Sequence, residues 1–216
     1  ADVTIEAPDA KVQLTDVGLS WEVRRGVIDA HVEVLGGTAE RAGRTVAIGR
    51  SRIEAALDLD DERATLTRAE LQVDGLTASV SGKLESLCEV PEVALSGQLF
   101  VPLSMVPRLT GQLPGAQGSV WARVVATGKI TSPSVRAEIQ ATDVVLPPAR
   151  PGDLSARVSF SGKEIELEEF HARVGLGWVK AQAHLTLDDA LTLKAQIETQ
   201  DASLGRALEK AGIAGA

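Results

Sequence analysis

Apolar and polar residues alternate along most of the chain, which is the pattern of β-strands with one buried face. Between residues 28 and 34, for example, apolar side chains at even positions are separated by Asp29, His31 and Glu33. About a dozen such runs follow one another at the spacing of roughly 8–12 residues that is typical of a meandering sheet. The pattern predicts an all-β protein whose sheet has one apolar and one polar face.

Turn-forming residues separate these runs. We expect turns at Gly36-Gly37, Asp74-Gly75, Ser161-Gly162-Lys163 and Asp188-Asp189, and a firmer break formed by Pro147-Pro148 with Pro151-Gly152.

Two segments have helical rather than strand periodicity. In Pro102–Leu113 the apolar residues recur at helical spacing, and a proline suits the first turn of a helix. In Ser203–Ile213 the serine is a suitable N-cap, and the apolar residues form one stripe that Gly212 would end. The fold class expected is therefore all-β with one or two short helices.

Each half of the chain consists of alternating strands followed by one of these helices. This order suggests a long repeat, with residues 1–113 and 114–216 as two loosely repeated halves of a single elongated unit. Because Ala1–Thr4 begins directly in an alternating pattern without a signal peptide, we expect an interior segment of a longer envelope protein.

The composition argues against binding of nucleic acid. The net charge is -8, the acidic and basic residues are interspersed, and aromatic residues make up 3% with no tyrosine. A basic stripe or stacking platform is therefore missing. The sequence also lacks a stretch of the ~20 apolar residues that a membrane-spanning helix needs.

Residues with catalytic or metal-binding chemistry do not form a known motif. His31, His171 and His184 fall in separate strands without metal-ligand spacing, so solvated histidines are expected. The single cysteine, Cys88, follows Leu87, and we expect a buried, unreactive thiol. The sequence thus predicts no catalytic residues, no metal and no cofactor.

Two acidic clusters, at residues 58–62 and 164–169, are expected to be solvated turns or strand exteriors. The enzyme alternative would be a carbohydrate-active protein using Glu164, Glu166 or Glu168, with two carboxylates facing each other about 5–10 Å apart across a cleft.

The three tryptophans have different expected positions. Trp21 is in phase with its apolar neighbours, so ordinary packing is expected. Trp121 is out of phase and is expected on the outer surface or an edge, and Trp178 at the start of a strand.

A sheet with one apolar face must cover that face with a second sheet, by closing into a barrel, or by holding an apolar ligand in an open trough. The expected inner residues are mostly small aliphatic ones, whereas sandwich cores commonly carry large aromatic anchors, so the trough is favoured. A structural or adhesive β-sandwich with a filled core and no ligand is the alternative. The residues expected to line the groove are Ile28, Ala30, Val32, Ile53, Leu57, Leu59, Val93, Leu95, Leu99, Val120, Ala122, Val124, Ala126, Val135, Ile139, Val158, Phe160, Val179, Ala183, Leu185, Leu187, Leu193 and Ile197.

The order of features from Gly97 to Ile213 resembles the TamB family, and more broadly the AsmA-like, repeating β-groove proteins. The resemblance rests on a short helix at 103–115 and on a glycine-led strand from Gly118 that continues through Gly-Lys-Ile-Thr-Ser-Pro-Ser-Val. It also rests on the string from Gly175 through Leu193, in which a Gly-x-Gly is followed by strand, turn and strand, and more loosely on residues 82–93.

This resemblance implies an elongated β-taco, a U-shaped curved sheet with an apolar inner groove. Family members are anchored in the inner membrane, cross the periplasm of Gram-negative bacteria and meet an outer-membrane barrel of the TamA/Omp85 type. They are linked to phospholipid transport to the outer membrane and to assembly of outer-membrane proteins. The resemblance therefore implies a groove that shields acyl chains or client strands, with anchor and barrel contacts made by parts outside this chain.

Overall fold

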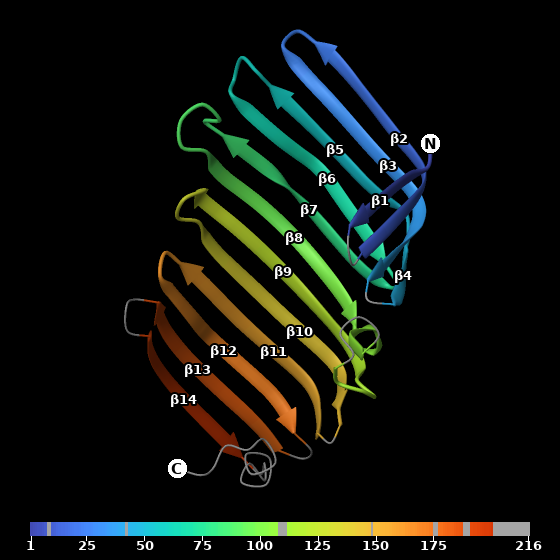
Figure 1. Cartoon of the computed structure of the whole chain (residues 1–216). Helices are drawn as coiled ribbons and strands as arrows, with labels where there is room; N and C mark the ends of the chain where they lie inside the picture. Colours follow the sequence, from blue (N-terminus) through green and yellow to red (C-terminus); the bar gives the residue numbers. More distant parts are fainter. Residues whose placement is uncertain are drawn as a thin grey trace.

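The computed structural model describes residues 1–7, 10–41, 43–107, 112–147, 149–174, 177–187 and 191–200. These residues form one antiparallel sheet of fourteen strands and one short 3-10 helix, η1 (Figure 1). The strands are β1 (Val3–Ala7), β2 (Ala10–Arg24), β3 (Val27–Arg41), β4 (Arg44–Ile48), β5 (Ser51–Asp58), β6 (Arg63–Val73), β7 (Leu76–Glu85), β8 (Glu92–Pro102), β9 (Gln117–Lys129), β10 (Ser134–Leu146), β11 (Ala149–Ser161), β12 (Glu164–Val174), β13 (Gly177–Leu187) and β14 (Leu191–Gln200), with η1 (Leu103–Met105) between β8 and β9. The all-β prediction is confirmed.

The sheet is a meander in which nearly every strand pairs with the next one in the chain. The exception is β3, which pairs with β4 along one half and with β5 along the other. The strands β4 and β5 thus act as one strand interrupted at residues 49–50, and Gly49 N–H donates to the carbonyl of Gln72 at 2.8 Å. The order across the sheet therefore follows the order along the chain, from β1 at one edge to β14 at the other.

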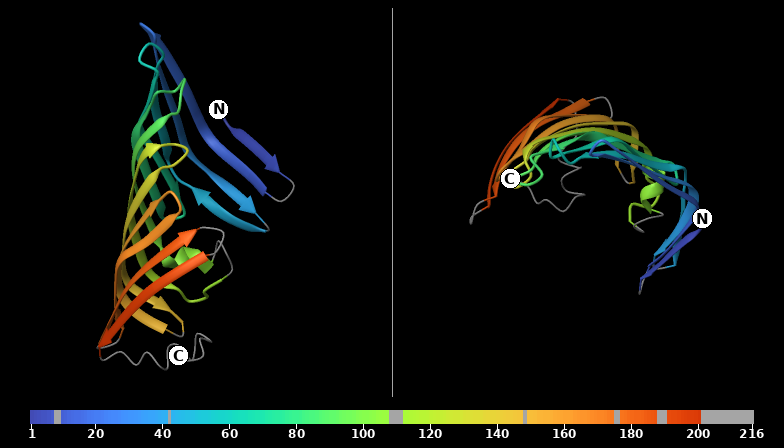
Figure 2. Two further views of the ribbon diagram at one scale, coloured as in Figure 1. Left: turned by 90° about the vertical axis from the view of Figure 1, so that its left-hand side faces the viewer. Right: turned by 90° about the horizontal axis from the view of Figure 1, so that it is seen from above.

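The sheet is curved into an arch, which Figure 2 shows from above with η1 on its inner side. The predicted U-shaped sheet is confirmed. β-Bulges bend individual strands, and the register between β9 and β10 shifts next to Asp143, whose φ is 53°. Opposite this bulge Gly118 adopts a φ of 100°, and a Cβ there would lie 2.5 Å from the carbonyl oxygen of Thr142. Glycine is therefore required where the two backbones approach.

Two of the hairpins are closed by two-residue turns with positive φ at both positions. Arg25-Gly26 joins β2 to β3 with φ values of 48° and 82°, and Asp74-Gly75 joins β6 to β7 with 49° and 92°. Such turns match the right-handed twist of paired strands. The predicted turn at Asp74-Gly75 is confirmed, as is the one around Gly162 between β11 and β12.

The turn predicted at Gly36-Gly37 is wrong, because both residues lie inside β3. Gly37 pairs with Leu14 on one side and with Ile48 on the other. A Cβ at Gly37 would lie 2.2 Å from the carbonyl oxygen of Gln13, so the glycine serves the close packing of neighbouring backbones rather than a reversal.

The helix predicted at Pro102–Leu113 begins as expected, with η1 followed by helical residues 106–107. Residues 108–111 lie outside the described part of the chain, as does the helix predicted at Ser203–Ile213. The strands on either side of η1, β8 and β9, pair directly along eleven residue pairs, so the sheet continues through the boundary between the expected halves. The repeat itself stays a prediction.

The accessible surface is unusually large for the mass of the chain. It measures 14328 Å² for 22.7 kDa, whereas a compact monomer of that mass exposes about 9,500 Å². Within the described ranges no second sheet covers the first, and the buried hydrophobic residues are Val93, Met105, Ala116, Ala122, Ala141, Val144 and Ala172. The fold is therefore a single curved layer.

Gly82 offers a test of the close strand packing. Its φ is 150°, and a Cβ would lie 2.1 Å from the carbonyl oxygen of Ala94. Gly82→Ala should therefore lower the free energy of unfolding by about 2 kcal/mol or more, measured by urea denaturation. Gly18→Ala is the matched control, because its Cβ would meet only the carbonyl oxygen of Glu33 at 3.9 Å. Equal effects of the two substitutions would contradict this account.

Candidate functional site: the concave apolar face

The register of the sheet brings the apolar residues of successive strands side by side. Two unbroken ladders of twelve directly paired residues cross from β2 to β14, and neither contains a charged, amide or hydroxyl side chain. The first ladder is Trp21, Ala30, Ala55, Leu66, Gly82, Leu95, Ala126, Val135, Phe160, Ile165, Leu185 and Leu193. The second is Leu19, Val32, Ile53, Ala69, Val80, Gly97, Val124, Ala137, Val158, Leu167, Ala183 and Ala195.

A third, shorter ladder runs beside them from β6 to β14. Its members are Leu71, Ala78, Leu99, Ala122, Ile139, Ala156, Phe170, Ala181 and Ile197. We call the three ladders together the apolar face. Because side chains alternate between the two faces of a strand, residues of this parity all point to the same side of the sheet.

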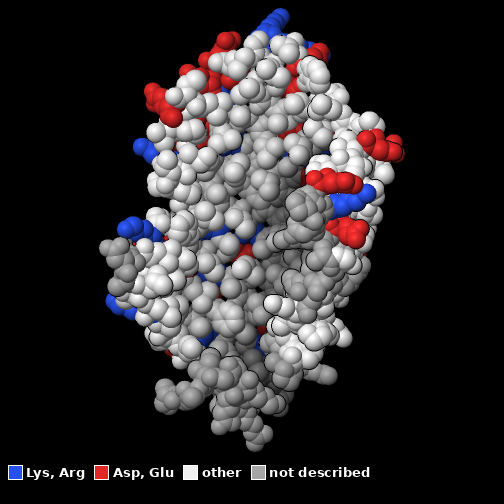
Figure 3. Space-filling model, viewed as in Figure 1, with Lys and Arg blue, Asp and Glu red and all other residues white. Residues whose placement is uncertain are grey.

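The apolar face lines the inside of the arch. Figure 3 views the concave side, where charged side chains gather at the margins and the middle is mostly uncharged. Many side chains of the apolar face are exposed to solvent. Leu19 is 61% exposed, Trp21 69%, Leu193 65% and Ile197 60%.

The residues predicted to line the groove share this face, with one exception. Most belong to the three ladders, and Ile28, Leu57, Val93, Val120, Val179 and Leu187 continue the same parity toward the strand ends. Leu59 lies instead in the turn after β5, where it is 58% exposed. The alternation of side chains between the two faces ends where β5 ends, at Asp58. Leu59 therefore does not belong to the face that lines the groove.

Sequence reasoning missed the apolar residues of β6 and β12. In β6 the parity changes between Leu66 and Ala69, and in β12 between Leu167 and Phe170, because each strand contains a bulge. The extra residue in a bulge moves every later side chain of that strand to the opposite face of the sheet. The apolar residues then no longer follow a strict period of two. In β12 the sequence gives a sign of this change, because two consecutive charged residues, Glu168 and Glu169, interrupt the alternation.

The dimensions of the groove follow from the sheet. Twelve strands at a spacing of about 4.8 Å give ladders about 50 Å long. At the inner side of the arch, η1 contacts β9, and Met105 is only 2% exposed. η1 therefore lies over one margin of the groove, about midway between β2 and β14.

The opposite, convex face carries charge in an ordered pattern. Directly paired residues from β3 to β12 form a ladder whose charged members alternate in sign, namely Glu33, Arg52, Glu70, Ser79, Gln98, Arg123, Glu138, Arg157 and Glu169. Arg157 lies 3.9 Å from Glu138 and 3.6 Å from Glu169. Cross-strand pairs of opposite charge stabilise a sheet and like charges destabilise it, so the ladder favours the observed register.

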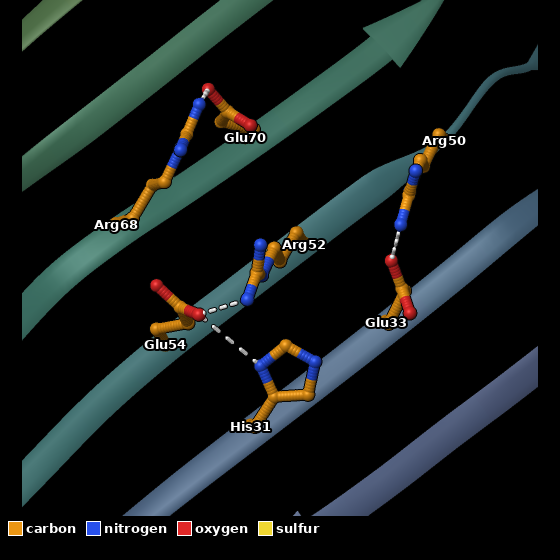
Figure 4. A network of polar contacts seen from close by, with 7 residues as sticks. All are labelled: His31, Glu33, Arg50, Arg52, Glu54, Arg68 and Glu70. Carbon is orange, nitrogen blue, oxygen red and sulfur yellow. Dashed lines mark hydrogen bonds and ion pairs between the residues drawn. The ribbon is translucent and has the colours of Figure 1, made fainter.

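Figure 4 shows the N-terminal part of this face, where His31 of β3 faces Glu54 of β5 and where Arg68 and Glu70 pair within β6. Arg50 donates two hydrogen bonds to Oε1 of Glu33, from Nε at 2.8 Å and from Nη2 at 2.5 Å. These bonds lower the pKa of Glu33 below the ordinary carboxyl value of 4.5. Nearby, Glu54 pairs with Arg52 and, at 3.5 Å, with Nδ1 of His31.

The tryptophans divide between the two faces. Trp121 is on the convex face, as predicted, opposite Phe100. Trp178 lies near the start of β13, as predicted, where its Nε1 donates to Gln200 at 3.0 Å and Lys180 sits 4.9 Å above its ring. Trp21 has the predicted apolar phase, but the ordinary packing expected of it is not found, because its side chain is 69% exposed and no second layer covers the concave side in the described residues.

The acidic clusters have the predicted surroundings. Residues 59–62 form the turn after β5, and Oδ1 of Asp58 accepts hydrogen bonds from the amides of Asp60 and Asp61, each at 3.1 Å. Glu164, Glu166 and Glu168 all belong to one strand, β12, and Glu168 lies 3.7 Å from Arg136. A cleft between facing carboxylates is not formed by these three residues. Among all the described residues, no group of three potential metal ligands gathers.

Cys88 is exposed in the connection between β7 and β8, so the prediction of a buried thiol is wrong. The neighbouring Glu62 carboxylate, by its negative charge and by hydrogen bonding, raises the pKa of the thiol. Because the thiolate is the reactive form, the predicted low reactivity is consistent with this geometry, although electrostatics rather than burial is the cause.

No family model, curated protein or solved structure matches this chain. Among the helices that the structure describes, none has the length and apolar character needed to cross a membrane.

The Glu33–Arg50 pair predicts a specific pH dependence. A carboxyl group with a lowered native pKa stabilises the fold above its unfolded pKa, and this contribution is lost as the pH falls through the native value. Glu33→Gln should therefore lower the urea midpoint at pH 7 and reduce the difference between the midpoints at pH 7 and pH 3. Glu166→Gln, an equal change of charge on exposed β12, is the control, and the same response from both variants would argue against the pair.

The thiol of Cys88 provides a second test. Glu62→Gln removes the neighbouring negative charge, so the pKa of Cys88 should fall and its reaction with a disulfide reagent at pH 8 should become a few-fold faster. Asp60→Asn removes a charge from the same turn without touching the thiol's partner. If both substitutions accelerate the reaction equally, the cause is the overall negative charge of the turn and not the contact between Glu62 and the thiol.

Proposed function

We propose that the apolar face binds the acyl chains of lipids and shields them from water. The observation that supports this function is the pair of twelve-residue apolar ladders on a concave surface that the described residues leave open. An open apolar surface of this extent marks an interaction site on a soluble domain.

The hydrophobic effect is large enough to hold such a ligand. Transfer of a chain of ~16 methylenes from water is worth about 13 kcal/mol before losses, at ~0.8 kcal/mol each. A bilayer's hydrocarbon core of about 30 Å holds two acyl chains end to end. A groove of about 50 Å could therefore take about three chains in line.

The chemistry of the face determines its selectivity. The indole N–H of Trp21 is the one side-chain hydrogen-bond donor in the ladders, so binding depends mainly on chain length and little on headgroup identity. Uniform apolar walls also give a bound chain similar contacts at successive positions along the ladders. The proposed role is thus passive, and energy or direction for transport would come from elsewhere.

The resemblance to the TamB family extends the proposal to a cellular setting. In that setting the lipid is a phospholipid that moves toward the outer membrane through the periplasm of a Gram-negative cell. An outer-membrane barrel of the TamA/Omp85 type is then a partner of parts outside this chain.

The alternative of a structural or adhesive sandwich depends on a filled core. In the described residues the seven buried hydrophobic side chains are mostly small, and the large ones at the N-terminal end of the ladders are exposed. This distribution favours a ligand-holding trough over a ligand-free sandwich.

Two adjacent valines of equal exposure allow a matched test. Val124 belongs to the apolar face and is 36% exposed, whereas Val125 points to the convex face and is 37% exposed. Val124→Asp should reduce crosslinking of a photoactivatable palmitic acid at least about fivefold, because a charge is placed against the chain. Val125→Asp should leave the crosslinking near that of the unaltered protein.

Circular dichroism and urea denaturation should accompany both variants, so that loss of folding is separated from loss of binding. Equal losses in two folded variants, or no crosslinking to the unaltered protein, would overturn the proposed function. Mass spectrometry of lipids retained by the purified chain should find acyl lipids with mixed headgroups.

A further inference from the structure

Among the described residues, β14 leaves one edge of the sheet unpaired along its whole length. β14 pairs with β13 through ten consecutive residue pairs without a register shift, and all of its residues are exposed. Within the described residues nothing pairs with its other edge. A regular edge of this length, without proline or a bulge, is a template for another strand.

The sequence of β14 is self-complementary when two copies run antiparallel. If the pairing is centred on Gln196, Lys194 of each copy lies directly opposite Glu198 of the other, so two contacts of opposite charge form at once. On the apolar face the same register sets the small Ala195 opposite the large Ile197 of the second copy. Because of the two-fold axis, each of these contacts occurs twice in the pair of copies.

This register continues the charge pattern of the convex face. Within one copy Glu198 pairs with Lys180 of β13, so the second copy's Lys194 would give the series Lys180, Glu198, Lys194 with alternating sign. The charged residues of the ladder from Glu33 to Glu169 alternate in sign in the same way. In the described part of the chain, Lys194 makes no ion pair that would compete with the contact.

The axis that relates the two edges must also keep the apolar faces on one side. A two-fold axis perpendicular to the sheet does so, because it reverses the strand direction without turning the sheet over. The apolar ladders of one copy would then run into those of the other, since Ala195 and Ile197 are both ladder members.

The other edge of the sheet is a poorer partner for β14. β1 has five residues, so it offers at most five backbone pairs, whereas residues 192–200 of β14 all pair when β14 is centred on Gln196. Its Glu6 is already paired with Lys11 at 3.0 Å. Pairing of β14 with β1 of the next copy would also leave an edge free at each end and build an open chain of molecules.

We propose that two copies of this chain associate edge to edge through β14, about a two-fold axis at Gln196, to form one continuous sheet and one groove of twice the length. The proposal rests on the strand edge and its charges, and not on lipid binding. An experiment on the assembly can therefore fail without bearing on the proposed function.

A disulfide crosslink tests the register directly. Residues directly opposite in an antiparallel pair have Cα atoms about 4.5–5.5 Å apart, which is within the span of a disulfide. In a Cys88→Ser background, Gln196→Cys should therefore give a covalent dimer within minutes of adding a mild oxidant. Thr192→Cys on the same edge is the control, because the register places the two introduced thiols about 27 Å apart.

The mass of the assembly provides the second measurement. Light scattering during size-exclusion chromatography should give about twice 22.7 kDa for the unaltered chain. Lys194→Glu should weaken the dimer about tenfold, since two contacts become repulsive, and Lys194→Glu with Glu198→Lys should restore most of the loss.

Each contrary result overturns the proposal. A monomer at 100 µM would exclude the dimer, and a mass that keeps rising with concentration would indicate head-to-tail growth. Equal crosslinking of the two cysteine variants would exclude the register.

Discussion

Backbone pairing between successive antiparallel strands fixes every other feature of this molecule. Because each strand pairs with the next one in sequence, the apolar residue of one strand is set directly beside that of its neighbour. Twelve repetitions convert a local alternation into ladders about 50 Å long. The opposite face receives the charged residues by the same rule, and their alternating sign penalises a slipped register.

A single layer has little buried volume, so its stability depends on cross-strand contacts rather than on a packed core. Few side chains are fully buried, and many on the concave face keep a third or more of their surface exposed. The arch arises from bulges and from glycines at close approaches such as Gly118. These positions make the inner face concave without closing it. The apolar surface thus stays available, which is the basis of the proposed binding of acyl chains.

The two proposals use different surfaces of the same sheet. Acyl-chain binding uses the side-chain face of the interior strands, whereas association uses the backbone edge of β14 and its convex charges. In a continuous sheet built from two copies the two grooves would form one groove, because the two-fold axis leaves both apolar faces on the same side of the sheet. The ladder members of β14 are all apolar, so no polar side chain would interrupt the joined groove where the two copies meet.

Alternation by itself determined which residues share a face. It predicted the all-β fold, the outer position of Trp121 and the common face of the groove residues within the strands, whereas the turn-forming pair Asp74-Gly75 predicted the β6–β7 turn. The period of a strand without a bulge is a local property of its backbone, so alternation in the sequence is enough to predict it.

Only the tertiary structure decided where that period breaks and whether the apolar face is covered. The bulges in β6 and β12 reverse the parity, Gly36-Gly37 continues a strand, and Trp21 and Cys88 are exposed. Each depends on contacts with a neighbouring strand or on the lack of a second layer. Curvature and closure arise from many strands together, and no single run of residues encodes them.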